Sequence, residues 1–543
     1  MTAIWRPGSA LLDAVAASQG RTFARYLPLA HPAPTPYHTR AYASQHAGKF
    51  PADVAAFEKT QPQRWVKPWF NDPSCLVWDE KNQIYRGFSI SQSNPDSQGG
   101  DQQTWMEIIT PDLVTFINNR SPFYLDNLPY PALWGGSFLI DQHNAAGYGA
   151  GAVLYYISVP GSDTSSLQCV SLWIAPALGL APVYHGIVLE NPGVGAIVYA
   201  PGMDFRDPRV SWDDARSRFV MKLTIGRGIA FYSSTDGLNW SFLSLIDLSD
   251  WQQIETPDLV PMEAPDGSEK WLLAFSIKQW NGQAASSVAY LIGDWDGTTF
   301  KPDFTTPKRL NWGSDYYAQA ISQHEGNTYC WGWMGNWNYM ELPQQGFGGN
   351  HSLITRLSLA QDVDGSLGLR MQFMPDQLNC YAEFTDAILS LPLSSSGTSQ
   401  WQPPVQNMGV SWRLDLQLYR DAPDPWPDAI SINFCVGPKN RTTLTLNPQA
   451  GTVTLLRAQS GGGPLDTADT KKWAIWNADQ VATLPNRARY FISIIVDVST
   501  IEIIINDEVY ISSLFFPPED AFSSDVTVSG NGTARLLYFK QSY

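Results

Sequence analysis

The sequence predicts an all-β protein in which a five-bladed β-propeller is followed by a C-terminal β-sandwich. Short apolar runs separated by turn-forming residues begin near residue 70, and roughly five clusters of them fit before residue 370. A cleaner alternation of apolar and polar residues follows residue 399. We therefore expect an N-terminal arm with short helices over 1–60, a propeller over 61–385 and a sandwich over 386–543.

The N-terminal arm holds the few stretches with helical periodicity, near residues 9–18 and 51–59. In the first stretch Asp13 interrupts the apolar run and no basic region precedes it, so we expect no signal peptide. The compartment therefore stays open. We expect either an intracellular protein or a secreted form without its signal.

The propeller is predicted from β-rich runs that each end in turn-forming residues, such as 152–157, 271–275 and 328–333. About four such strands form one blade of a propeller. No clean sequence repeat accompanies the strands.

The second domain is predicted from a composition break followed by period-2 patterning. Residues 391–399 are mostly small and polar, which predicts a linker. Beyond them, apolar residues alternate with polar ones over 410–418, as a half-buried strand requires. The apolar positions of 444–446 and 453–455 face each other across a turn, and a further hairpin is predicted over 501–511. A β-sandwich fits these strands.

Composition and charge exclude several classes of function. The chain has 543 residues, of which 44% are apolar and 16% charged, so it can bury a large core and is not disordered. A net charge of -16 argues against nucleic-acid binding, and no apolar run is long enough to span a membrane. The 22 Trp residues suit sugar rings, although they also serve to fill a large β core.

Three acidic residues stand beside prolines in otherwise β-rich sequence. Asp72 lies in the sequence WFNDPSC (69–75), and Pro73 biases it toward an extended backbone. The alternative is an ordinary Asn-Asp-Pro turn. Asp207 lies in DFRDPRV (204–210), where Arg206 favours its ionised form; the alternative is a surface ion pair.

The third acidic residue, Glu255, lies in IETPDLV (254–260). A carboxyl group in apolar surroundings, near other acids, has a raised pKa, as a general acid needs. Each motif alone is weak evidence, but the three in this order rarely arise together by chance. Retaining cleavage of a glycosidic bond requires two carboxyl groups about 5–5.5 Å apart, and the axial pocket of a propeller brings distant residues together.

On these residues the sequence resembles the β-fructofuranosidase family of invertases, inulinases, levanases and fructosyltransferases. Residues 69–75, 206–208 and 255–258 are similar to its patterns Trp-Met-Asn-Asp-Pro-Asn-Gly, Arg-Asp-Pro and Glu-Cys-Pro-Asp. Further similar motifs occur, in the expected order, at 92–95, 134–137, 294–297, 315–318, 331–334 and 501–503.

The resemblance implies a propeller followed by a sandwich, with Asp72 as nucleophile, Glu255 as general acid/base and Asp207 holding the fructose hydroxyls. It further implies that Arg206 supports the acid/base pair. The substrate-binding residues it implies are Asn71, Gln92, Trp134, Gly136, Ser137, Arg206, Asp315 and Trp333.

Three departures from the family pattern predict an unusual placement of substrate. Ser74 and Cys75 replace the usual Asn-Gly, and residues 105–107 read Trp-Met-Glu where the family has Trp-Gly-His. A Trp that usually precedes this motif is replaced by residues 96–100, DSQGG.

The predicted reaction is cleavage of terminal β-fructofuranosyl linkages of sucrose, fructo-oligosaccharides or fructan by double displacement, with transfer to a second sugar as a further outcome. Alternatives are a dedicated sucrose-using fructosyltransferase, an inverting five-bladed enzyme acting on arabinose or xylose, and a non-catalytic fructan-binding protein. The seven His show no ligand spacing, so we expect no metal and no cofactor. The number of assembled chains, exo or endo attack and the preferred substrate stay open.

Overall fold

The computed structural model describes residues 70–542 apart from 93–102, 114–116, 119–120, 124–131, 162–166, 193–203, 227, 252, 279–286, 340–349, 375–382, 388–390, 395–398, 402–410, 421–422, 464–467, 498, 518–522 and 530–531. The helices predicted near 9–18 and 51–59 lie outside these residues. Within the described part of the chain, no helix has the length and apolar character needed to cross a membrane.

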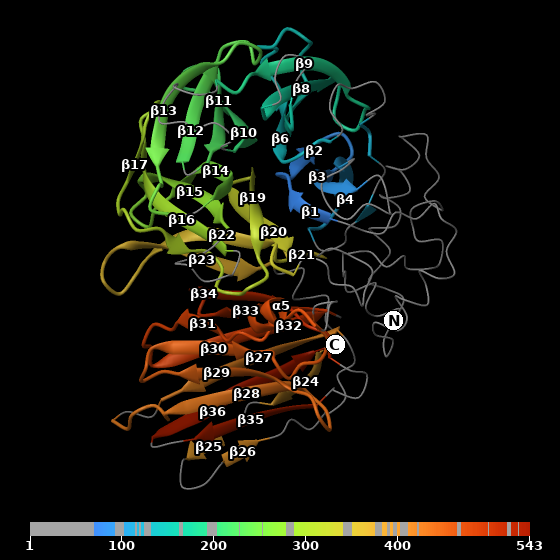
Figure 1. Cartoon of the computed structure of the whole chain (residues 1–543). Coiled ribbons are helices and arrows are strands. Elements are labelled where there is room, and N and C mark those ends of the chain that lie inside the picture. Colours follow the sequence, from blue (N-terminus) through green and yellow to red (C-terminus); the bar gives the residue numbers. More distant parts are fainter. Residues whose placement is uncertain are drawn as a thin grey trace.

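The first three propeller sheets follow one another along the chain (Figure 1). The first has the order β1 (Phe70–Pro73), β3 (Ile84–Gln92), β4 (Gln103–Thr110), β5 (Ile117–Asn118), with β2 (Val77–Asp79) paired to β3. The second is β6 (Gly136–Asp141), β7 (Ala152–Val159), β8 (Cys169–Ala175), β9 (Val183–Leu189). The third is β10 (Phe205–Asp213), β11 (Arg218–Ile225), β12 (Gly228–Ser234), β13 (Ser241–Asp247).

Two further sheets complete the propeller. The fourth is β14 (Ile254–Glu263), β15 (Glu269–Ile277), β16 (Ser287–Trp295), β17 (Phe300–Pro302), with β18 (Lys308–Arg309) paired to β16. The fifth is β19 (Tyr317–His324), β20 (Asn327–Met334), β22 (Thr355–Gln361), β23 (Leu367–Phe373), with β21 (Asn350–His351) paired to β20. The predicted five blades are confirmed, and β7, β15 and β20 contain the three predicted strands.

The first strand of each sheet is its innermost strand. β10 contacts both β6 and β14, and β19 contacts both β14 and β1. Apolar residues on both faces of the middle strands pack against the neighbouring blades, so β7 is buried along its whole length. This packing fixes the position of the innermost strands, whose side chains meet near the propeller axis.

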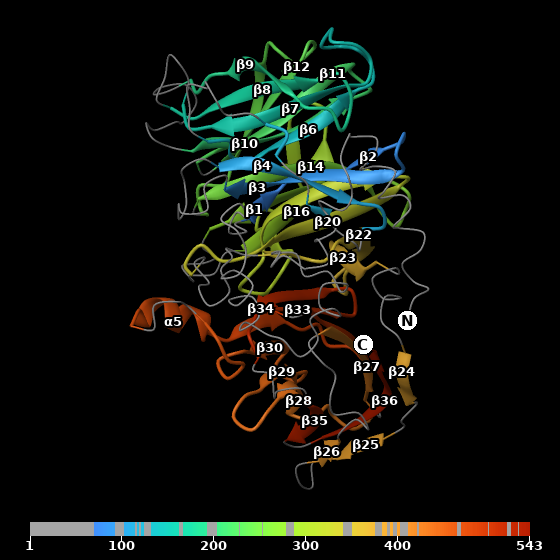
Figure 2. The same cartoon turned by 90° about the vertical axis from the view of Figure 1, so that its right-hand side faces the viewer.

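The second domain is a sandwich of two antiparallel sheets (Figure 2). One has the order β24 (Glu383–Ala387), β36 (Thr533–Ser542), β27 (Ser411–Tyr419), β32 (Arg489–Asp497), β33 (Thr500–Ile505), β34 (Val509–Leu514), with β25 (Leu391–Ser394) paired to β36. The other is β26 (Ser399–Trp401), β35 (Ser523–Ser529), β28 (Ala429–Val436), β29 (Thr442–Asn447), β30 (Thr452–Leu456), β31 (Gln480–Thr483).

The hairpins predicted in the sandwich have the predicted register. Leu444 pairs with Leu455 and Leu446 with Val453 between β29 and β30. These four side chains are fully buried in the core between the two sheets. The strands predicted over 410–418 and 501–511 correspond to β27, β33 and β34.

Two local features differ from the prediction. Residues 391–394, predicted as linker, form β25, which pairs with β36 through backbone hydrogen bonds that do not need apolar side chains. The strand β24, which spans the expected boundary at 385/386, pairs with the same strand. The helix α5 (Thr470–Trp476) was not predicted; Asp469 caps its N-terminus by accepting from the backbone N–H groups of residues 471 and 472.

The edge of the sandwich formed by β33 and β34 faces the propeller (Figures 1 and 2). Ile495, Ile504 and Tyr510 of the sandwich join one buried apolar cluster with Tyr316 and Leu310 of the propeller. Because this cluster is continuous with the core of the last two blades, the domains share buried apolar surface.

Candidate active site

The three predicted catalytic carboxylates lie on the innermost strands of three different blades. Asp72 is in β1, Asp207 in β10 and Glu255 in β14. Their carboxyl groups influence one another, since burial and then the charges of Asp207 and Glu255 raise the pKa of Asp72. Asp207 is only 2% exposed and Asp72 lies within a strand, so the surface ion pair and the ordinary turn are both wrong.

Two β-bulges, one in β10 and one in β14, orient the side chains of Asp207 and Glu255. The register between β10 and β11 shifts between Arg206 and Arg209, and a corresponding shift occurs at the start of β14. The bulge residues Asp207 and Thr256 have φ angles of 60° and 51°, a left-handed conformation that costs a non-glycine residue about 1–2 kcal/mol. Bulges of this kind re-aim side chains beside active sites.

The backbone around Asp207 holds its carboxylate in place. The Thr256 N–H donates to Asp207 Oδ2 at 3.0 Å, and the Asp207 N–H donates to Ser158 Oγ at 2.7 Å. A Cβ atom added at Gly135 would lie 2.3 Å from Asp207 Oδ1, so only glycine fits against this oxygen.

Glu255 is held by a cation on one oxygen and by a phenol on the other. Arg206 donates to Glu255 Oε1 through Nη2 and, at 3.2 Å, through Nε. The Tyr317 hydroxyl donates to Oε2. Arg206 also pairs with Asp204, whose other oxygen accepts from Gln253 Nε2 at 2.5 Å. The carboxylate therefore has a defined orientation.

The distribution of charge differs from the sequence-based expectation. Burial and the two neighbouring carboxylates raise the pKa of Asp72 to about 8. Burial alone would raise the pKa of Glu255, but Arg206, Lys278 and the hydrogen bond from Tyr317 outweigh it and lower this pKa. The raised pKa expected for Glu255 is therefore wrong, because its surroundings are cationic rather than apolar.

Two predicted substrate-binding residues lie near the carboxylates, and a third, Trp134, precedes Gly135, which packs against Asp207. Asn71 is buried and its Nδ2 donates to Asp72 Oδ1 at 3.4 Å. Trp333 is buried and its ring centroid lies 6.5 Å from that of Tyr317, which contacts Glu255. Trp134 is partly exposed, and its carbonyl accepts from the indole of Trp105 at 2.6 Å.

Two other predicted residues use their polar atoms to join blades. Ser137 Oγ donates to Pro208 O at 2.8 Å and accepts from Val210 N at 2.9 Å, so it fixes β10 next to Asp207. The carbonyl of Gly136 accepts from Arg209 at 2.8 Å. Gln92 is the last residue of β3, and its side chain lies outside the described part of the chain.

Asp315 lies in a different set of contacts. It is fully buried and forms an ion pair with Arg457 of the sandwich, and its Oδ2 accepts from the backbone N–H of Leu514 at 2.9 Å. Its carboxylate is therefore occupied by the second domain, which argues against the predicted contact with substrate. The sequence could not show this, because the partner lies 142 positions away along the chain.

Two residues were missed although they lie in the quoted motifs. Tyr317 lies in the motif at 315–318, and its hydrogen bond to Glu255 is not apparent from that motif. Arg209 is buried; its guanidinium donates to the carbonyls of Pro73 at 3.0 Å and Gln319 at 3.3 Å, in addition to Gly136. It thus ties its own blade to three others, and its position directly after Asp-Pro is the signal that could have found it.

Two of the three departures from the family pattern have structural roles, and the third, at 96–100, lies outside the described residues. Ser74 Oγ accepts from the backbone N–H of Phe88 at 2.8 Å, and the Cys75 thiol donates to Phe138 O at 3.5 Å. Glu107 is buried and pairs with Arg86 at 2.6 Å. These substitutions hold neighbouring strands and leave the three carboxylates in place.

No group of three or more His, Cys, Asp or Glu side chains in the described ranges is arranged to hold a metal ion. Arg206 and Arg209 offset part of the negative charge that surrounds Asp72.

Comparisons with known proteins match this architecture. Residues 63–369 match glycosyl hydrolases family 32 N-terminal domain, and residues 389–541 match glycosyl hydrolases family 32 C terminal. The chain is 27% identical over 485 residues to the levanbiose-producing levanase of Bacillus subtilis (strain 168), covering 86% of each protein. It is 31% identical over 332 residues to that of Geobacillus stearothermophilus, covering 59% of this chain and 79% of that protein.

Solved structures show the same fold. The exo-inulinase from Aspergillus awamori superposes with a TM-score of 0.74 at 21% identity, covering 89% of this chain and 96% of that chain. The resemblance predicted from the motifs is thus confirmed, and the chain belongs to glycosyl hydrolases family 32 as an enzyme with the propeller and sandwich of that family.

Proposed function

We propose that this enzyme cleaves terminal β-fructofuranosyl linkages of fructans or sucrose with retention of configuration. The observation that carries the proposal is the meeting of Asp72, Asp207 and Glu255 from three blades, with Arg206 and Tyr317 both bound to Glu255. Two neighbouring carboxyl groups of this kind serve double displacement.

In the first step Asp72 attacks the anomeric carbon of the fructosyl unit while Glu255 gives its proton to the departing oxygen. A fructosyl ester forms on Asp72 and the glycosidic bond breaks. In the second step Glu255 takes a proton from water, the water oxygen bonds to the anomeric carbon, and the ester bond to Asp72 breaks. Asp207 holds the sugar hydroxyls through both steps.

The distribution of protons between Asp72 and Glu255 shapes the pH dependence of the reaction. With the pKa of Asp72 near 8 and that of Glu255 lowered, the form with Asp72 ionised and Glu255 protonated is a minor one. Its population is highest between the two pKa values, so the rate still follows a bell-shaped curve. Substrate binding must stabilise this form for the reaction to proceed.

Levan is the first substrate to test, since the chain is similar to two levanbiose-producing levanases. Incubation with levan, inulin and sucrose, followed by chromatography, identifies the substrate and separates exo from endo attack. We expect fructose release that stops in Asp72→Ala while binding persists. Wild-type protein that binds fructan and never cleaves it would instead support a binding protein.

Two further measurements test the remaining alternatives, which are transfer to a second sugar and inversion of configuration. At high sucrose, glucose released well in excess of fructose indicates transfer to a second sugar. NMR of the first product formed from a β-fructoside should show the β anomer; the α anomer would establish inversion.

A further inference from the structure

The chain segment that leads into β19 is docked onto the sandwich. Hydrogen bonds join it to the second domain. Trp312 N donates to Tyr510 O at 2.8 Å, Ser314 N donates to Gln480 Oε1 at 2.9 Å, and Asn311 accepts from Ser512 N at 3.1 Å and donates to Ser512 Oγ at 2.8 Å. A Cβ atom added at Gly313 would lie 1.8 Å from Ser512 O, so the two backbones approach as closely as glycine allows. The sandwich therefore fixes the path of residues 311–315.

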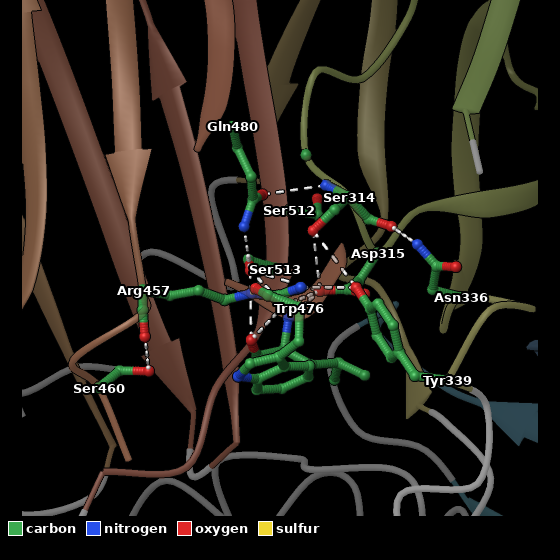
Figure 3. Close-up of polar contacts among 12 residues, drawn as sticks. Ser314, Asp315, Asn336, Tyr339, Arg457, Ser460, Trp476, Gln480, Ser512 and Ser513 are labelled. Atoms are coloured by element: carbon green, nitrogen blue, oxygen red, sulfur yellow. Dashed lines mark hydrogen bonds and ion pairs between the residues drawn. The ribbon is translucent and has the colours of Figure 1, made fainter. Parts of the chain in front are cut away.

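Arg457 of the sandwich lies at the centre of this contact (Figure 3). The Arg457 and Asp315 side chains have no solvent exposure and form an ion pair. The guanidinium also donates hydrogen bonds to Trp476 O at 2.9 Å, Ser513 Oγ at 3.0 Å, Leu514 O at 2.8 Å and the Tyr339 hydroxyl. In addition, it lies 3.9 Å from the ring centroid of Trp476. All three guanidinium nitrogens are thus engaged.

Asp315 and the catalytic carboxyl group are joined through only two further residues. Tyr317 follows Asp315 by two positions and donates its hydroxyl to Glu255 Oε2. The next residue, Ala318, has a φ angle of 50° and its N–H donates to Ser276 Oγ at 2.8 Å. The backbone between Asp315 and Ala318 is therefore held at both ends, and the position of the phenol follows from it.

We infer that Arg457 is a positioning residue for catalysis: by holding Asp315 from the second domain, it places the Tyr317 hydroxyl on the general acid/base Glu255. The inference rests on the proposed role of Glu255. The sandwich then contributes to turnover without touching the substrate. A displacement of the phenol by about 1 Å is enough to lower the rate strongly, since catalytic groups act only in a narrow geometry.

The test uses the full chain with Arg457→Lys, which keeps the positive charge and loses the planar fork. We expect kcat to fall about tenfold with KM nearly unchanged. We also expect the acid limb of the pH profile to move to higher pH, because the bond from Tyr317 helps to lower the pKa of Glu255.

A double-mutant cycle with Tyr317→Phe separates positioning from general destabilisation. If Arg457 acts through the phenol, Arg457→Lys changes kcat by less than about twofold in the Tyr317→Phe background. If the two substitutions lower kcat by factors that multiply in full in the double variant, the inference is overturned. A folded Arg457→Lys enzyme with wild-type kcat and pH profile would overturn it as well. Should Arg457→Lys fail to fold, the near-isosteric Asp315→Asn and the milder Ser513→Ala enter the same cycle under the same criteria.

Glu502→Gln is the matched control at the same domain interface. The Glu502 carboxylate accepts a hydrogen bond from the backbone N–H of Leu353 at 2.6 Å, and it forms no ion pair with residues 311–315. We expect its melting temperature to change while kcat and the pH profile keep their wild-type values. Glu255→Gln distinguishes the two proposals: an active Glu255→Gln enzyme refutes the proposed function, whereas an inactive one beside an unaffected Arg457→Lys refutes only the positioning role.

Discussion

The molecule contains two buried clusters of charge that differ in how well they are satisfied. At the domain interface, Asp315 meets one arginine, and both of its oxygens and all nitrogens of Arg457 have protein partners. At the propeller axis three carboxylates gather, and Asp72 accepts only a 3.4 Å bond from Asn71 among the described residues. A satisfied cluster stabilises one geometry, whereas an unsatisfied one retains capacity to react with a ligand.

The same contrast separates charge that supports folding from charge that supports function. Burial, and then the neighbouring charges of Asp207 and Glu255, raise the pKa of Asp72 to about 8, and this cost to folding is borne for catalysis. Substitutions in the two clusters should therefore affect different quantities.

The largest expected effect is on activity at the axis. Asp72→Asn should lower kcat by about 10⁴-fold or more, and Glu255→Gln by about 10²–10⁴-fold, because each removes a reacting group. Steady-state kinetics with the best substrate measures both. Circular dichroism provides the control, since both variants should keep the wild-type fold; near-normal turnover in a folded Asp72→Asn protein would contradict the assignment.

Arg206→Met should lower kcat/KM by about 10²-fold and move the acid limb of the pH profile upward. The arginine is the largest influence that lowers the pKa of Glu255, so its loss raises that pKa. Measurement of kcat/KM across pH tests both expectations. An unchanged acid limb would show that Arg206 does not control the ionisation of Glu255.

Arg457→Met should, in contrast to the substitutions at the axis, lower the free energy of unfolding more than the activity. Removing one partner of a buried ion pair costs about 3–5 kcal/mol, because Asp315 is left without its counter-charge. Denaturant unfolding of this variant beside Arg206→Met measures the difference. Equal losses of stability in the two variants would remove the distinction between the clusters.

Glu502→Gln gives the smallest effect, a change in how stability depends on pH. Burial raises the pKa of Glu502 to about 7, above its unfolded value near 4.5, so the native state binds a proton that the unfolded state releases. The stability of the wild type therefore falls as pH rises from about 4.5 to 7. Melting curves across this window should show that the variant loses this part of the slope, and an unchanged slope would contradict the assignment to Glu502.

Much of the fold and of the carboxylate site could be predicted from the sequence, because alternation and turn residues are local signals. The paired Leu444 and Leu455 and the Asp-Pro steps at Asp72 and Asp207 are examples. The role of Asp315 could not be predicted from the sequence, since its partner Arg457 approaches it only when the two domains dock. Similarly, the lowered pKa of Glu255 depends on how close Arg206, Lys278 and Tyr317 lie to its carboxylate, and the motifs alone do not show this proximity.

Trapping of the fructosyl–enzyme ester tests the central claim most directly. A β-fructosyl fluoride needs no proton on its leaving group, so Glu255→Gln should form the ester and hydrolyse it slowly. Mass spectrometry of the digested protein should then find one fructosyl unit on the peptide that contains Asp72. A fructosyl unit on another carboxylate, or release of the α anomer with no adduct, would contradict the account.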